Sequence, residues 1–231
     1  MKDDDLHIPV YGTNRDPRVA CVLLADVSSS MIDEPIDQLQ KGFVTFVEEV
    51  QADPLARKRA EIAVVTFGTE ATLLVPFREA RDLVPITFKI DGSTNLAAGI
   101  DLALDELERR VAAYKAEHLE FYRPWLFVLT DGAPNPGFEQ ALQRLNRAEA
   151  ADHVSVFAVG VGEEVAWDTL NRLTPERPAM KLNGYNFREM FRWLSDSLSS
   201  VSHSSAHGPG DKKNSGEQVP LPAVVWGAAP A

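Results

Sequence analysis

Short, continuous apolar runs alternate with longer helical patterns along most of this chain. Residues 19–25 are all apolar and lead directly into Asp26. A run this short and uninterrupted is typical of a strand buried on both faces, whereas a strand with one wet face alternates in polarity. Buried strands that alternate with helices predict an α/β domain with a doubly wound, mainly parallel sheet, helices on both faces and right-handed crossovers.

One pair of strands departs from the parallel pattern. Residues 61–67 and 71–77 flank a short turn that contains Gly68, which predicts a hairpin and therefore one antiparallel strand at an edge of the sheet. Apolar residues at helical spacing predict helices that begin near Pro35 and just after Thr94. Further along we expect strands at 125–130, 154–159 and 180–182, and helices at 138–150, 165–173 and 187–201.

The composition changes at both ends of this α/β pattern. We expect residues 1–16 to be an N-terminal extension, residues 17–201 to form one domain, and residues 202–231 to be a flexible tail rich in Ser, Gly, Pro and Lys. The tail contains a short apolar run at 219–226. This run could be a peptide ligand for a partner or could fold back on its own domain, and the sequence does not choose between the two.

Charge and composition exclude several classes of protein. The 231 residues include 34 acidic and 23 basic side chains, for a net charge of −11, so phosphate backbones and anionic lipid are poor partners. The N-terminus lacks the pattern of a signal peptide and no apolar run is long enough to span a membrane, so we expect a cytoplasmic protein without direct membrane insertion. The single cysteine, Cys21, lies in a predicted strand and is expected to be a buried, inert thiol.

Oxygen-bearing side chains follow two predicted strands and precede a predicted helix. Asp26, Ser28 and Ser30 alternate in the segment after the first strand, Thr94 lies in a Gly-Ser-Thr-Asn run, and Asp131 follows the strand at 125–130. In open α/β sheets, ligands bind beyond the carboxyl ends of the strands, where these segments fall. We therefore expect the five side chains to converge on one edge of the sheet.

A set of donors that contains oxygen but no nitrogen or sulfur suits a hard divalent cation. Hydroxyl ligands cancel little of the charge of an ion. If Ser28, Ser30 and Thr94 bind directly and the two aspartates act mainly through water, the ion stays electrophilic and takes an acidic side chain from a partner protein. We expect Mg²⁺ or Mn²⁺, with Ca²⁺ a poorer fit. The alternative is a purely structural role: a metal-free scaffold in which the same residues cap turns.

This combination of motifs resembles the von Willebrand factor A (vWA) domain family. The metal-ion-dependent adhesion site (MIDAS) of that family uses the pattern Asp-x-Ser-x-Ser, then Thr, then Asp, which Asp26, Ser28, Ser30, Thr94 and Asp131 match in order. The resemblance covers about residues 17 to 200. It implies a Rossmann-like fold and a protein-binding module rather than an enzyme.

Within the family, the segments around these residues look most like the bacterial TerY-type proteins linked to tellurium resistance. That resemblance implies a stress-response complex with protein kinase or phosphatase partners. Members of the group often have Gly where this chain has Ser29, and some carry a cysteine-rich zinc module that this chain lacks.

The residues beside the ligands are candidates for a rim that contacts the partner. These are Met31, Ser93, Asn95 and Asn135. The main rival interpretation is a metal-dependent phosphatase or hydrolase. A second aspartate in place of Ser28 and a Gly-Lys-Ser/Thr phosphate loop are both missing, and the five histidines lie outside the three motif segments, so no general base accompanies the metal set.

Overall fold

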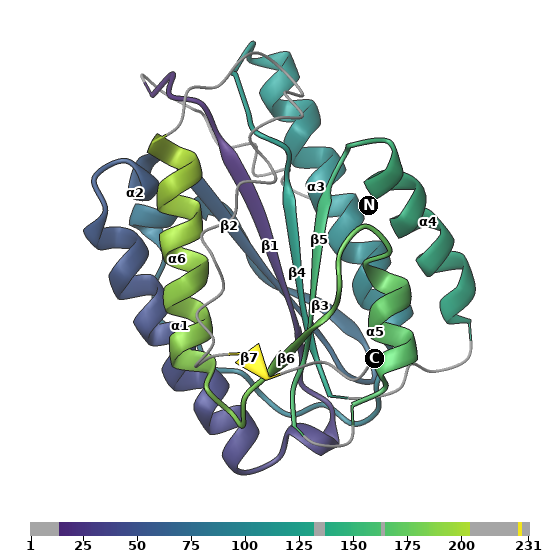
Figure 1. Ribbon diagram of the computed structural model, residues 1–231. Coiled ribbons are helices and arrows are strands. Elements are labelled where there is room, and N and C mark those ends of the chain that lie inside the picture. Colours follow the sequence, from purple (N-terminus) through teal and green to yellow (C-terminus); the bar gives the residue numbers. More distant parts are fainter. Residues whose placement is uncertain (1–13, 132–136, 163–164, 204–225, 228–231) are drawn as a thin grey trace, which may run out of the picture.

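The computed structural model describes residues 14–131, 137–162, 165–203 and 226–227. These residues form a seven-stranded sheet in the order β3-β2-β1-β4-β5-β6-β7 (Figure 1). Neighbours from β2 to β6 pair in parallel, whereas β3 and β7 are antiparallel edge strands. The strands are β1 (Val19–Asp26), β2 (Ala60–Phe67), β3 (Ala71–Glu79), β4 (Trp125–Thr130), β5 (Ser155–Gly160), β6 (Met180–Leu182) and β7 (Trp226–Gly227).

The predicted fold class is confirmed, and the structure adds a feature to it. The expected antiparallel edge strand is β3. A second one, β7, comes from the tail: Trp226 and Gly227 pair with Leu182 and Lys181 of β6. Trp226, the last residue of the apolar run 219–226, is thus paired with the domain, whereas residues 219–225 lie outside the described part of the chain.

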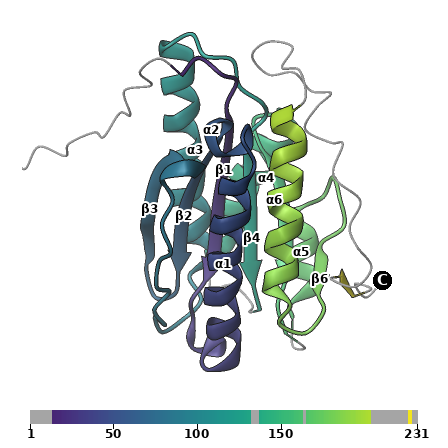
Figure 2. The same cartoon turned by 90° about the vertical axis from the view of Figure 1, so that its left-hand side faces the viewer.

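Helices cover both faces of the sheet, as Figures 1 and 2 show from two sides. One core joins α1 and α6 to one face, and a second core joins α3, α4 and α5 to the other. The helices are α1 (Glu34–Ala52), α2 (Ala56–Arg59), α3 (Leu96–Ala116), α4 (Phe138–Ala150), α5 (Trp167–Leu173) and α6 (Phe187–His203), with short 3₁₀ turns at Ser29–Met31 and Ala80–Asp82. No helix in the described part of the chain is both long and apolar enough to cross a bilayer.

The sequence of β1 is a continuous apolar run because its side chains point alternately into the two cores. Cys21 and Leu23 point into the core under α1 and α6, whereas Val22 and Leu24 point into the core under α3. Every residue of β1 is buried. The predicted burial of Cys21 is confirmed, and burial raises the pKa of its thiol to about 12.

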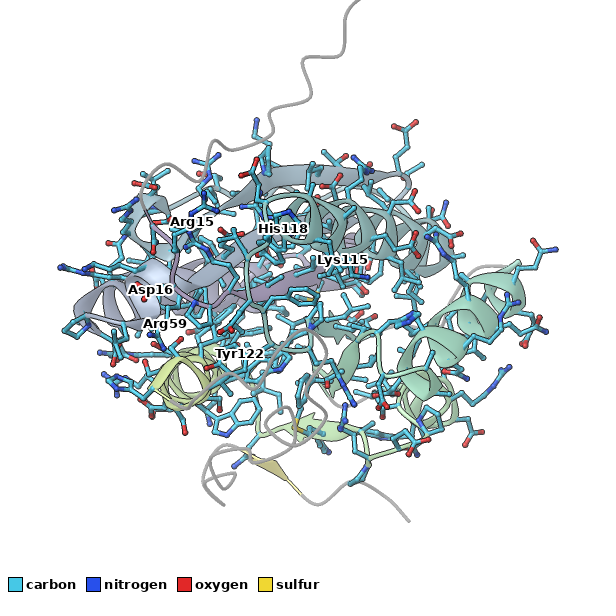
Figure 3. The ribbon with its side chains drawn as sticks, turned by 90° about the horizontal axis from the view of Figure 1, so that it is seen from above. Arg15, Asp16, Arg59, Lys115, His118 and Tyr122 are labelled. Atoms are coloured by element: carbon cyan, nitrogen blue, oxygen red, sulfur yellow. The ribbon has the colours of Figure 1, made fainter. Side chains whose placement is uncertain are left out.

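The end of the domain where β1 begins is held by polar contacts. The Arg18 side chain is fully buried and donates to Glu79 Oε1 at 3.0 Å and to the backbone oxygen of Asn14 at 2.8 Å. Figure 3 looks down on this end and shows Arg15, Asp16 and Arg59 close to it; Arg59 pairs with Asp16 at 3.3 Å. The described residues 14–16 are thus attached to the domain, and the carboxyl end of β1 lies at the opposite end.

Candidate metal centre

Two loops meet at the carboxyl end of β1 through backbone hydrogen bonds. The N–H of Ser29 donates to the carbonyl of Gly92 at 2.8 Å, and the N–H of Asp91 donates to the carbonyl of Val27 at 2.7 Å. The Ser29 hydroxyl also donates to the Gly92 carbonyl, at 2.9 Å, which is the third hydrogen bond between the two loops. The segment that carries Thr94 is therefore joined to the segment that carries Ser28 and Ser30.

Three predicted ligands are in direct contact. The Ser28 and Ser30 hydroxyl oxygens lie 2.9 Å apart, and the Ser30 hydroxyl donates to Asp131 Oδ1 at 2.8 Å. Ser28 is buried, Ser30 is exposed and Asp131 is partly buried. The cluster therefore runs from the interior to the surface, because Ser28 is buried and Ser30 is exposed to solvent.

Asp26 lies behind this cluster at the end of β1. It is fully buried, accepts the Ser28 N–H at 2.8 Å, and accepts the Thr130 hydroxyl on its other oxygen at 2.6 Å. These bonds fix the turn that presents Ser28. Sequence reasoning missed Thr130, although a polar residue at the end of the apolar run 125–129 and directly before Asp131 was the available signal.

Thr94, the fifth predicted ligand, lies two residues before the first residue of α3. It is half-buried and directly precedes Asn95, whose side-chain oxygen caps the helix by accepting the Ala98 N–H at 3.2 Å. The backbone N–H of Asn95 donates to the Gly68 carbonyl at 2.7 Å. The position of Thr94 is thus set by a helix cap and by the turn between β2 and β3.

The two aspartates carry unfavourable negative charge. Burial raises the pKa of Asp26, against hydrogen bonds from Ser28 and Thr130, and the nearby charge of Asp131 raises it further. Burial also raises the pKa of Asp131, opposed by the Ser30 hydroxyl. A cation beside these carboxylates would favour their ionised forms, so the electrostatics of the site suit a bound cation.

The spacing of the oxygens fits a small octahedral ion. With metal–oxygen distances of about 2.0–2.1 Å, adjacent ligands of Mg²⁺ stand roughly 2.9 Å apart. The two oxygen–oxygen separations at Ser30, 2.9 Å and 2.8 Å, are those of ordinary hydrogen bonds and are also compatible with that edge. No group of three or more His, Cys, Asp or Glu residues with metal-binding geometry occurs in the described ranges. The predicted set has two carboxylates, Asp26 and Asp131, and three hydroxyls, so it differs from a metal site built on three or more His, Cys, Asp or Glu side chains.

The predicted rim needs one correction. Met31 is fully buried in the core beneath α1, because the 3₁₀ turn Ser29–Met31 directs its side chain inward, so it cannot contact a partner. Ser93 is exposed and Asn95 is half-buried, while Asn135 lies outside the described residues. The neighbouring Ile32 is 48% exposed and was not predicted.

The fold and this cluster define a doubly wound α/β domain with a hydroxyl-rich candidate cation site at the carboxyl edge of its sheet. A model of the von Willebrand factor type A domain matches residues 21–191, and the chain belongs to that family. No curated protein matches it significantly.

Three solved structures illustrate the fold that this chain shares. A von Willebrand factor type A protein from Catenulispora acidiphila is 16% identical with a TM-score of 0.57, over 79% of this chain and 43% of that one. Proximal thread matrix protein 1 from the mussel byssus, with a zinc-occupied MIDAS motif, is 18% identical with a TM-score of 0.54, over 80% and 48%. Manganese-loaded TRAP protein of Plasmodium vivax is 16% identical with a TM-score of 0.52, over 77% and 73%. The chain spans about half the length, or less, of the first two.

Proposed function

We propose that this chain is a metal-dependent protein-interaction module, not an enzyme, whose site takes Mg²⁺ or Mn²⁺ and an acidic residue of a protein partner. Asp26, Ser28, Ser30, Thr94 and Asp131 are the proposed metal set. The observation that carries the proposal is the contact of Ser30 with both Ser28 and Asp131, because it brings oxygens from two distant segments to the spacing of one coordination shell.

The placement of the side chains supports an open site. Ser30 is exposed, so a group from outside can reach the cluster. Asp26 is buried and already accepts two hydrogen bonds, which suits it to hold Ser28 in place rather than to contact a ligand. When bound, the ion supplies a positive charge that the hydroxyls do not cancel, and a carboxylate from a partner is the matching ligand.

The finer assignment rests on sequence resemblance. We propose that the module works in the cytoplasm as part of a bacterial, TerY-like tellurium-resistance or stress-response complex, with a protein kinase or phosphatase as partner. Family membership supports the interaction role, and the zinc-occupied and manganese-loaded states of two structural relatives support a divalent ion.

Calorimetric titration of the metal-free chain tests the metal site. We expect saturable binding of one Mg²⁺ or Mn²⁺ per chain, weakened at least tenfold by Ser30→Ala. Ser29→Ala is the matched control, since Ser29 is exposed in the same turn and bonds to Gly92 instead of the cluster. Equal affinity in all three proteins would reject the assignment.

The partner claim needs a separate experiment. A captured kinase or phosphatase complex should dissociate in EDTA and should be lost with Asp131→Ala. A complex indifferent to both treatments would show that binding does not use the metal site.

A further inference from the structure

The outer edge of β6 carries a second feature that the metal site does not use. β6 pairs with β5 on its inner side, through Met180 with Val159 and Lys181 with Gly160. Its outer side would be an open sheet edge, and it is covered by Trp226 and Gly227 of β7. An open edge offers unpaired backbone N–H and C=O groups to any extended chain.

The described part of the strand that covers this edge is short. Two residue pairs form within the described residues, Leu182 with Trp226 and Lys181 with Gly227. Pro220 and Pro222 precede this segment and Pro230 follows it, and proline cannot donate to a ladder. The two described residue pairs supply few backbone hydrogen bonds to offset the entropy of closing the chain between His203 and Trp226, which favours a weak and exchangeable contact.

The β6 strand is anchored in the core by its side chains. Met180 and Leu182 are buried in the core that contains α1 and α6, whereas Lys181 is partly exposed. Figures 1 and 2 show β7 lying along β6 at the rim of the sheet. A rigid edge covered by a weakly held strand is the arrangement used in recognition by strand addition.

We propose that the outer edge of β6 is a docking site for an extended apolar peptide of a partner protein, and that the chain's own Trp226–Gly227 segment occupies it until the partner strand displaces it. The sequence of the tail suggests the kind of peptide that suits this edge, because Val224, Val225 and Trp226 are strong strand formers. This site requires no metal, so its test is independent of the interaction function proposed above.

The experiment compares two full-length proteins. One is the wild type, and the other carries Trp226→Pro and Gly227→Pro, which removes the two N–H donors of the tail strand and alters no residue of β1 to β6. The probe is a fluorescein-labelled peptide with the sequence of residues 217–231, followed by anisotropy in EDTA. A matched control peptide carries N-methyl groups at Trp226 and Gly227, so that it keeps the side chains and loses the N–H donors.

We expect the double-proline protein to bind the peptide saturably, with at least tenfold tighter affinity than the wild type. A tethered strand acts at an effective concentration of about 1 mM, so it would weaken a peptide with a dissociation constant of about 100 µM by roughly this factor. The N-methylated peptide should lose at least tenfold, and hydrogen exchange of Lys181 and Leu182 should slow only with the unmodified peptide.

Four outcomes would overturn the proposal. Absence of saturable binding to the double-proline protein would show that the edge does not accept a strand. Equal affinity for both proteins, or for both peptides, would show that the tail does not occupy the site or that the peptide adheres without pairing. A wild-type dimer that the two prolines abolish would show that the occupant is the tail of a second copy.

Discussion

The Ser30 hydroxyl donates a hydrogen bond to Asp131 at 2.8 Å across a sequence separation of 101 residues. The contact exists because β1 and β4 are parallel neighbours, so the turn after one strand lies beside the residue after the other. A second serine, Ser28, extends the contact to the buried end of β1. The candidate site is therefore a direct product of the strand order.

Metal binding should raise the thermal stability of the chain. A ligand at about 100 times its dissociation constant stabilises the folded state by about 2.7 kcal/mol, and each kcal/mol is worth about 2–4 °C at this chain length. We expect saturating Mg²⁺ or Mn²⁺ to raise the melting temperature by roughly 5–10 °C in scanning calorimetry. The shift should be reversed by EDTA and absent in Asp131→Ala, and a shift that persists in this variant would place the ion elsewhere.

Asp26→Asn should abolish the response to metal without lowering the stability of the metal-free chain at neutral pH. Because burial raises the folded-state pKa of Asp26, this group favours the folded state in acid, and that contribution is lost as the pH rises through the raised pKa. In EDTA at neutral pH the variant should thus be at least as stable as the wild type, since the amide can still accept from Ser28 and Thr130 can accept from the amide.

The measurement for Asp26→Asn is urea unfolding in EDTA at acid and neutral pH, with and without Mn²⁺. The stability of the variant relative to the wild type should increase from acid to neutral pH, and its response to Mn²⁺ should disappear. A variant that is less stable at neutral pH would mean that the ionised carboxylate stabilises the metal-free fold.

The sequence pattern predicted the sheet because a strand that is buried on both faces is apolar at nearly every position. The run at 19–25 became β1, and the hairpin at 61–77 became β2 and β3 with only small changes at the ends. The alternation of apolar runs with helical patterns indicates, from local sequence, which segments are strands and in which order they follow along the chain. The short β7 depends instead on a contact between Trp226 and distant Leu182, for which the sequence holds no local signal.

The site was predictable where it depends on strand ends and unpredictable where it depends on side-chain direction. Ser28, Ser30 and Asp131 follow strands, and the structure brings them together. Met31 is next to Ser30 in sequence, yet a single 3₁₀ turn directs it into the core and leaves Ile32 exposed. Proximity in sequence therefore identifies the loop and not the face that a residue presents.

Asp53 stabilises α2 and the end of α6 together. Burial alone would raise its pKa, but the N–H groups of Ala56 and Leu55 and the side chain of His203 outweigh burial, so the pKa is lowered. That contribution is present above the unfolded-state pKa and is lost as the pH falls through the lowered folded-state pKa. Asp53→Ala should cost about 1 kcal/mol at neutral pH, mostly as a lost helix cap, because the His203 pair is exposed.

Chemical denaturation across acid and neutral pH checks the effect of Asp53. The difference between wild type and Asp53→Ala should shrink in acid. Asp53→Asn is the control, because an amide oxygen can still accept from Leu55 and Ala56. If Asn is as damaging as Ala, the charge and not the cap is the main contribution.

Gly42 sets how closely α1 and α6 approach. A Cβ placed there would lie 2.8 Å from both Phe187 Cβ and Phe191 Cδ2, closer than carbon atoms pack. Alanine in a helix normally gains about 0.5–1 kcal/mol over glycine, but overpacking of this kind costs about 1–3 kcal/mol. We expect Gly42→Ala to be net destabilising in urea unfolding, whereas Lys41→Ala, at an exposed position of the same helix, should change little. A more stable Gly42→Ala protein would mean that α6 can move away from α1 at little cost.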